Sequence, residues 1–249
     1  MTDMTDVKTI AECWGKLAPE YDLKNRKWYH SSPETWTKEI VPRIAGCKKI
    51  LDVGCGAGAL SLPLSKEFDV TSLDFSGKML QQMTVRKHEM QVDPEIVNAD
   101  TQNMPFKDDS FDAVICRYAV WPLPNPKHGI SEMVRVAKKK IVIVEGDWYE
   151  GNKPTLRQKI IGTPFYRVQG FYYKTRTGRD PNRHFKEMRK YHKIDTSSVK
   201  IRGWLEDCGI AVDDVDYSIV DRVSTRLARL MQKITGYGEL IFLINGEKR

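Results

Sequence analysis

Three closely spaced glycines follow an apolar run that carries a single acid. In the stretch ILDVGCGAGAL, Asp52 lies within the apolar run, and Gly54, Gly56 and Gly58 come directly after it. A glycine-rich turn after a strand lets the backbone approach a nucleotide closely. Gly54, Gly56 and Ala59 also satisfy the loose G-x-G-x-x-G/A pattern of dinucleotide-binding folds, which alone is a weak signal. The stretch therefore predicts a binding site for a nucleotide-containing cofactor.

Acidic residues near this turn indicate which cofactor it would bind. Asp52 beside a pyrophosphate would be an unfavourable like-charge neighbour, whereas it would attract the ammonium and sulfonium groups of S-adenosylmethionine (SAM). Asp74 ends the next apolar run, where a carboxylate can accept hydrogen bonds from ribose hydroxyls. Asp100 ends the run after that, with room for an adenine amino donor. The acids favour SAM over a nicotinamide cofactor, and a nicotinamide oxidoreductase or an inactive binding protein of the same fold are the alternatives from other classes.

These residues lie at the ends of short apolar runs that alternate with helical patterns. The expected strands are residues 49–53, 69–74, 95–100, 111–116 and 140–146, with helices at about 57–68, 76–90 and 125–137. Such alternation predicts an α/β fold with a doubly wound, Rossmann-like sheet that binds its ligand at the carboxyl ends of the strands. Outside this region we expect helices at 6–22, 32–45, 197–209 and 224–234, and strands at 212–219 and 239–244.

The chain divides into four predicted segments. They are a helical cap (1–46), a cofactor-binding core (47–146), a basic aromatic insertion (147–196) and the C-terminal part of the core (197–249). Residues 151–195 contain twelve Lys and Arg against three acids, a balance of +9, so the remainder of the chain carries about −2 and the basic character belongs to this segment. Three interpretations stay open for it: a solvated lid, a site for an anionic or protein substrate, or an RNA-binding surface.

Composition narrows the class of protein. The 249 residues are 41% apolar, which is enough for a full core, and no apolar run approaches the ~18 residues of a membrane span. The polar N-terminus argues against a secretory signal. Five scattered cysteines, without zinc-site spacing, predict reduced thiols, a cytoplasmic location and no metal site.

Four motifs in order carry a family resemblance. LDVGCGAGALSLPL, SLDFSGKML, NADTQNMPFKDDSFDAV and EMVRVAKKKIVIVE resemble class I SAM-dependent methyltransferases, and in particular the ubiquinone/menaquinone (methyltransferase domain 11-like) group. The resemblance covers about residues 49–144, and more weakly AECWGKLAPEYD and the closing elements. It implies a seven-stranded sheet with an antiparallel last strand, and conversion of SAM to S-adenosylhomocysteine.

The resemblance also implies roles for individual residues. Asp52 and the three glycines would line the methionine end of the cofactor, and Asp74 would hold the ribose. The other implied cofactor contacts are Tyr21, Phe75, Met79, Asp100, Thr101, Met104 and Arg117. The candidate substrate contacts are Trp121, Asp147, Tyr149 and Arg176. No catalytic base is assigned, because in-line methyl transfer depends largely on positioning. A small-molecule acceptor is expected, with a protein or RNA acceptor as the alternative.

The sequence departs from the family pattern at three places. Cys55 interrupts the glycines and is interpreted as a packing residue, and Pro63 predicts a kink in the helix at 57–68. Residues 137–140 replace the usual glycine-containing turn before the fifth strand, which leaves the geometry of that turn open.

Overall fold

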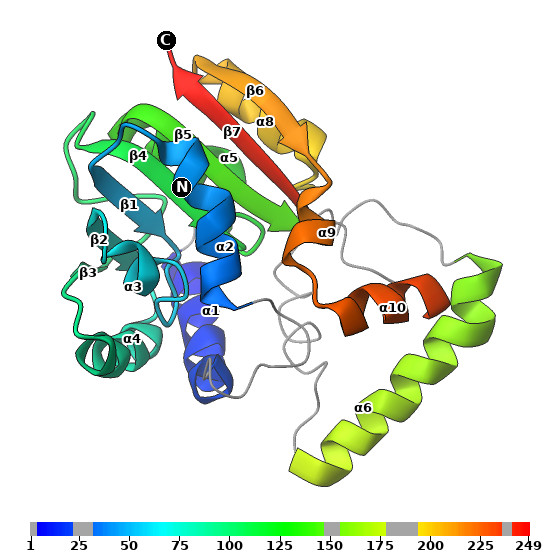
Figure 1. The fold of residues 1–249 in the computed structure, drawn as a ribbon. Helices are drawn as coiled ribbons and strands as arrows, with labels where there is room; N and C mark the ends of the chain where they lie inside the picture. Colours follow the sequence, from blue (N-terminus) through cyan, green and yellow to red (C-terminus); the bar gives the residue numbers. More distant parts are fainter. Residues whose placement is uncertain (1–3, 22–31, 147–154, 178–193, 236–240) are drawn as a thin grey trace.

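A central seven-stranded sheet organises the protein (Figure 1). The computed structural model describes residues 4–21, 32–146, 155–177, 194–235 and 241–249. The strands are β1 (Lys49–Val53), β2 (Asp69–Asp74), β3 (Glu95–Asn98), β4 (Phe111–Arg117), β5 (Ala137–Gly146), β6 (Ile210–Asp216) and β7 (Ile241–Lys248). Their spatial order is β3-β2-β1-β4-β5-β7-β6. β1 to β5 pair in parallel, whereas β7 is antiparallel to both β5 and β6, which confirms the predicted fold class.

The strand order places the ligand site. The chain moves outward from β1 to β2 and β3, and then returns to the other side of β1 for β4 and β5. Ligands of open α/β sheets bind at such a reversal, beyond the carboxyl ends of the strands. This rule places the ligand site where β1, β2 and β4 end, which is also where the glycine turn begins.

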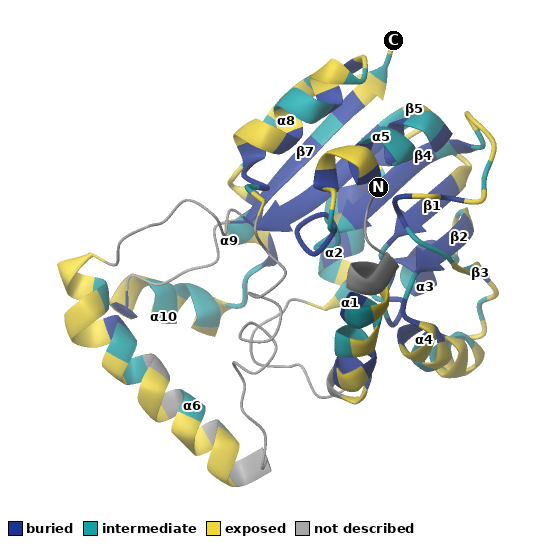
Figure 2. Ribbon diagram, turned by 180° about the vertical axis from the view of Figure 1, so that it is seen from behind, coloured by how far each residue is buried: buried dark blue, intermediate teal, exposed yellow. Residues whose placement is uncertain are grey.

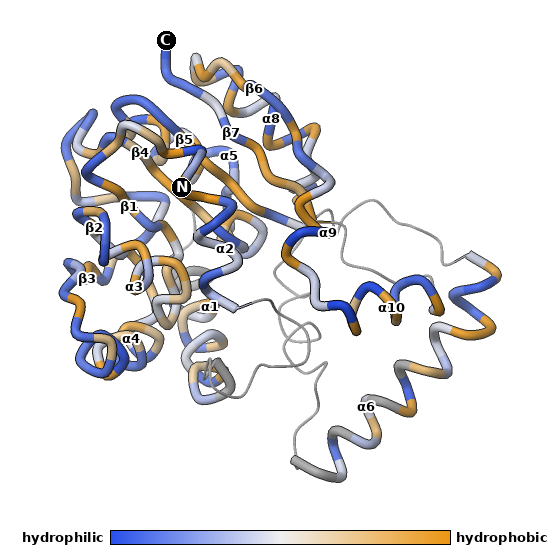
Figure 3. The backbone as a smooth tube through the Cα atoms, in the orientation of Figure 1, coloured by the Kyte–Doolittle hydropathy of each residue, from blue (hydrophilic) through white to orange (hydrophobic). Residues whose placement is uncertain are grey.

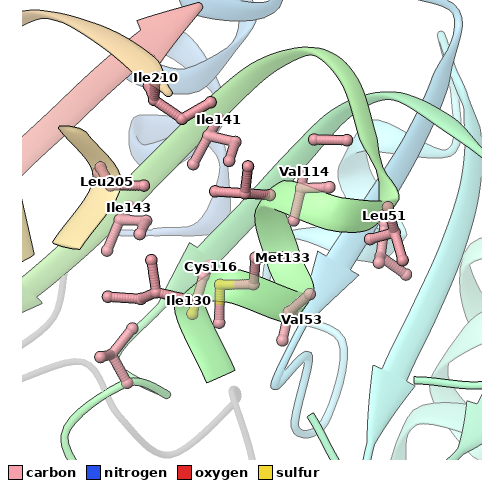
Figure 4. Packing of buried hydrophobic residues seen from close by; sticks show 14 of the residues in the cluster. Leu51, Val53, Val114, Cys116, Ile130, Met133, Ile141, Ile143, Leu205 and Ile210 are labelled. Carbon is pink, nitrogen blue, oxygen red and sulfur yellow. The ribbon is translucent and has the colours of Figure 1, made fainter. Parts of the chain in front are cut away.

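Alternate residues of the central strands supply two separate cores. Leu51, Val53, Val114, Cys116, Ile141 and Ile143 point to one face and pack with side chains of α5 (Pro126–Val136) and α8 (Ser198–Asp207) (Figure 4). Ile50, Ala113, Ile115, Val142 and Val144 point to the other face, toward α2 (Pro33–Ile40) and α9 (Ile219–Val223). Because successive side chains in a strand point to opposite faces, a strand covered on both sides must be apolar throughout.

The remaining helices flank this sheet. α1 (Met4–Leu17) continues into the 3-10 turn η1 (Ala18–Tyr21), and α2 begins at Pro33 as predicted and continues into η3 (Val41–Ile44). α4 (Gly77–Met90) contacts both α1 and the short α3 (Ser61–Leu64). In the insertion, η4 (Gln158–Gly162) is a π-helical turn that leads into α6 (Thr163–Thr177), and α10 (Arg226–Thr235) follows α9. None of the helices described has the length and apolar character needed to cross a bilayer.

Some element boundaries differ from those predicted. The helix predicted at 57–68 is reduced to α3, because the glycine turn extends to Leu60 and Pro63 has no N–H group with which to continue a helix. β5 begins at Ala137, directly after α5, and its register with β4 shifts between Phe111 and Ala113. A bulge therefore stands where the family has a glycine-containing turn. β6 begins at Ile210, and Ile219 starts α9 instead of ending a strand.

Candidate functional site

The glycine turn after β1 is shaped by a close approach between backbones. Gly54 has a φ of +67°, its N–H donates to the Leu73 carbonyl at 2.8 Å, and a Cβ there would lie 2.1 Å from the Cβ of Ala119. Only glycine fits this position. Gly56 has a φ of +54°, and apart from its two chain neighbours no heavy atom of the described residues lies within 4 Å of where its Cβ would be. The turn thus packs tightly on one side and borders open space on the other.

Asp74 ties the end of β2 to this turn. One oxygen of its carboxylate, Oδ2, accepts from the Gly56 N–H at 2.8 Å, and Oδ1 accepts from the Ser76 N–H at 2.8 Å. The side chain is buried, and burial raises the pKa of Asp74 to about 6, although the two backbone hydrogen bonds oppose that shift. Each oxygen keeps a lone pair that can accept a further hydrogen bond beside the open space at Gly56.

Asp52 is a second buried acid on the neighbouring strand. The Ser61 hydroxyl donates to its Oδ2 at 2.5 Å. Burial raises the pKa of Asp52 to about 6, with Ser61 and the charge of Arg117 opposing the shift and Asp74 adding to it. Two acids whose charged forms are disfavoured by burial create a site that a bound cation would complement.

The chain after β4 makes a strained turn beside the glycines. Arg117 ends β4 with its guanidinium carbon 5.0 Å from the centre of the Trp36 ring. Tyr118 then has a φ of +59°, which is uncommon for a bulky residue and marks local strain. This turn brings Ala119 against Gly54.

Glu145, near the end of β5, is a functional candidate that the sequence reasoning missed. Its side chain is fully buried, and Oε2 accepts from the N–H groups of Val120 and Trp121, each at 3.1 Å. Oε1 accepts from the N–H of Gly146 at 3.0 Å. Glu145 therefore fixes the loop that follows β4. A signal was present, since a lone acid in the apolar run IVIVEG repeats the pattern of Asp52 in ILDVG.

A small apolar cluster packs α1 against the residues that follow β2 and β4. Trp121 and Ile10 form its buried part, with Cys13, Trp14 and Phe75 packed against them. The Trp14 and Trp121 rings meet edge to face, with centroids 6.1 Å apart and planes at 67°. Phe75, predicted beside the adenine, and Trp121, predicted beside the substrate, are thus bridged by α1, which lies off the carboxyl ends of the strands (Figure 1).

The other predicted residues are distributed unevenly. Met79, Thr101 and Met104 are buried, and Met104 belongs to the main core beneath α5. Asp100 lies two residues past β3, and its Oδ1 accepts from the N–H of Gln102 at 2.9 Å. Asp147 and Tyr149 fall outside the described residues, as do the side chains of Tyr21 and Arg176. The structure therefore brings together the glycines, Asp52, Asp74, Phe75 and Arg117, and Cys55 packs with apolar side chains as interpreted.

Comparison with known proteins agrees with this geometry. Residues 51–144 match a methyltransferase domain family. A demethylmenaquinone methyltransferase of Renibacterium salmoninarum is 30% identical over 141 residues, which cover 55% of this chain and 58% of the relative. A phosphatidylethanolamine N-methyltransferase of Cereibacter sphaeroides is 40% identical over 101 residues, covering 39% of this chain and 49% of the relative. The chain thus spans between about half and 60% of the length of these curated relatives.

Solved structures extend the likeness to the whole fold. The [4+2]-cyclase SpnF superposes with a TM-score of 0.65 at 13% identity, covering 96% of this chain and 94% of the other. A magnesium protoporphyrin IX methyltransferase from Synechocystis PCC 6803 with bound SAM superposes with a TM-score of 0.61 at 15% identity, with full coverage of both chains. At such identity these structures show the fold alone. By motifs and by fold, the chain resembles the class I SAM-dependent methyltransferases, and its residues 51–144 match a methyltransferase domain family.

Proposed function

We propose that this protein transfers a methyl group from SAM to a small-molecule acceptor. The observation that carries the proposal is the arrangement at Asp74, whose carboxylate is held by two backbone N–H groups at the edge of the space bordered by Gly56. Asp52 lies buried on the adjacent strand. A cofactor with a ribose and two cationic groups uses both acids, whereas a pyrophosphate would be repelled by them.

The described residues fit SAM, which supplies a methyl group on a positively charged sulfur when bound. We assign Asp52 and the glycine turn to the methionine end, and Asp74 to the ribose. Phe75, Met79, Asp100, Thr101 and Met104 are assigned to the adenine side, and Arg117 to the methionine portion. The protein's part in the reaction is to orient the cofactor and exclude water under α1, so that an acceptor atom can lie in line with the methyl group.

The acceptor class follows from the relatives. Those named above act on demethylmenaquinone and phosphatidylethanolamine, and a further relative is a ubiquinone/menaquinone C-methyltransferase from Geotalea daltonii, 29% identical over 148 residues. We therefore propose a small molecule, with quinones as the first acceptors to test. None of these names supports a protein or RNA acceptor, and an anionic acceptor stays a prediction. All five cysteines are free thiols, which supports a reducing, cytoplasmic setting.

Calorimetric titration with SAM tests the cofactor assignment. Two ribose hydrogen bonds to a charged acceptor are worth about 1.5 kcal/mol each or more, so Asp74→Ala should weaken SAM binding about a hundredfold. Asp69→Ala is the matched control, because Asp69 is exposed at the opposite end of β2. Equal SAM affinity in the Asp74 variant and the wild type would refute the ribose role. Methyl-labelled SAM with purified quinones, or with fractionated host extract, then identifies the acceptor.

A further inference from the structure

Exposed apolar side chains gather in two helical segments. Of thirteen large apolar side chains that are exposed among the described residues, nine lie in residues 155–177 or in α10. They are Leu156, Ile160, Ile161, Val168, Phe171, Tyr172, Leu227, Leu230 and Ile234. We call these two segments the α6–α10 surface. Figure 2 shows that most of α6 is exposed. On soluble proteins, exposed apolar side chains are usually scattered singly. A contiguous group of them therefore indicates an interaction site.

The same segments carry charge of one sign. Residues 155–177 contain five Lys and Arg, α10 contains three more, and neither segment contains an acid. The whole chain has 33 acids in 249 residues, so about four would be expected in a stretch of this combined length. The α6–α10 surface is therefore both apolar and purely cationic.

Both helices separate these properties into stripes. In α10, Leu227, Leu230 and Ile234 recur at helical spacing and are about half exposed, while the exposed Arg226 and Lys233 flank them. Side chains of α10 between these stripes are buried or half-buried, so its inner face is already used.

α6 shows a weaker form of this pattern, because its apolar and polar residues are less segregated around the helix than those of α10. Val168, Phe171 and Tyr172 share one face and are 57–70% exposed, with the exposed Arg167 and Lys174 beside them. In Figure 3 hydrophilic and hydrophobic positions alternate along both helices.

A structural link joins the two segments. The Arg157 guanidinium donates to the carbonyl oxygens of Lys233 and Ile234 at the C-terminal end of α10, the latter from Nε at 3.2 Å. A cation is favourable at that end of a helix. η4, which leads into α6, packs against α10, and both helices lie off the carboxyl end of β5, beyond the same edge of the sheet as α1 (Figure 1).

We propose that the α6–α10 surface docks on an anionic lipid membrane, with both helices in the plane of the interface. The apolar stripes would enter the boundary between headgroups and acyl chains, and the flanking cations would meet anionic headgroups. A second copy of the chain fits less well, because pairing two α6–α10 surfaces would place their cations against one another. RNA would match the charge, but it would leave the aliphatic stripe of α10 without stacking or hydrogen-bonding partners.

Co-sedimentation of the full chain with vesicles tests the proposal without any need for methyl transfer. Binding is expected to vesicles of phosphatidylcholine with 30% phosphatidylglycerol, and to be far weaker to phosphatidylcholine alone and at high salt. Each cation at an anionic surface contributes about fivefold, so Arg167→Gln with Lys174→Gln should weaken partitioning about 25-fold.

A second variant tests the apolar stripe. Leu227→Ser, Leu230→Ser and Ile234→Ser together should abolish binding at every salt concentration, while the variant stays folded with a modestly lower melting temperature. Val85→Ser with Val199→Ser is the matched control, since both valines are exposed on other helices, and it should bind as the wild type does.

Three results would overturn the proposal. The first is no binding of wild type to anionic vesicles. The second is binding that the stripe variant keeps, which would mean that another surface docks. The third is a dimer or an RNA complex that the stripe variant loses, in the absence of vesicle binding, since the surface would then serve that partner instead.

Discussion

Replacing Asp52 by Asn should stabilise the cofactor-free protein and lower its affinity for SAM. Burial raises the pKa of Asp52 from 3.8 to about 6, and each pKa unit corresponds to about 1.36 kcal/mol, so the ionised group costs the folded state about 3 kcal/mol at neutral pH. Asn has the same shape and keeps an oxygen that can accept from Ser61. We therefore expect Asp52→Asn to raise the free energy of unfolding by about 2–3 kcal/mol at pH 8, or the melting temperature by roughly 4–12 °C for a chain of this size.

The pH dependence gives the sign of the effect. Because the folded-state pKa lies above the unfolded value of 3.8, the folded wild type binds a proton more tightly than the unfolded chain does. The penalty is full above pH 6, shrinks as the pH falls from 6 toward 4, and is absent below 4. The difference between variant and wild type should follow the same course. Urea unfolding at pH 8, 6 and 4.5, without SAM, measures it, with the exposed Asp69→Asn as control.

The affinity for SAM should fall in the Asp52→Asn variant, although its stability rises. If the ionised Asp52 carboxylate attracts the cationic part of SAM as proposed, bound SAM should raise the melting temperature of the wild type more than that of the variant. An Asn variant that is less stable than wild type, or a stability difference that is equal at pH 4.5 and pH 8, would refute burial as the origin of the effect. SAM affinity unchanged by the substitution would remove Asp52 from the methionine end.

Three further substitutions test the supports of the site by urea unfolding. Gly54→Ala should lower the free energy of unfolding by about 2–4 kcal/mol, because the new Cβ would lie 2.1 Å from another Cβ and φ is positive. Gly203→Ala, on a helix face that borders open space, should raise the free energy of unfolding by about 0.5–1 kcal/mol. Glu145→Ala leaves three backbone N–H groups without their acceptor and should lose about 3 kcal/mol or more, while Glu145→Gln should lose less. Arg135 binds Glu132 and thereby lowers the pKa of Glu132. Glu132→Gln should therefore lower the free energy of unfolding by about 1–2 kcal/mol at neutral pH, and should have no effect once the pH falls below that lowered pKa. A loss from Glu132→Gln that persists in acid would contradict the ion pair as its cause.

Local patterns predicted the parts of the fold that depend on neighbouring residues. The strands β1 and β2 begin and end where their apolar runs do, because a parallel strand covered on both faces needs an unbroken run. The helix predicted at 57–68 was too long, because the glycine turn and Pro63 together leave only Ser61–Leu64 helical. β5 began earlier than predicted, since pairing with β4 and β7, which are distant in sequence, draws the lysines at 138–140 into the sheet. The four-part division of the chain stays a prediction.

Two buried acids of the candidate site show that sequence reasoning finds residues whose partners are close in the chain and misses those whose partners are distant. Asp52 was identified because Gly54, Gly56 and Gly58, which we assign to the same ligand, follow it within six residues. Glu145 was missed because the N–H groups it binds lie 24 and 25 residues earlier, at Trp121 and Val120, and only the sheet brings them together. Both acids interrupt a buried strand near its carboxyl end, where an uncompensated charge would be costly. An acid in such a run must therefore hold either a loop or a ligand. Glu145 accepts from three backbone N–H groups of the loop and strand end, whereas the hydrogen bonds that Asp52 accepts from the described residues come from Ser61. We therefore assign the loop to Glu145 and propose the ligand for Asp52.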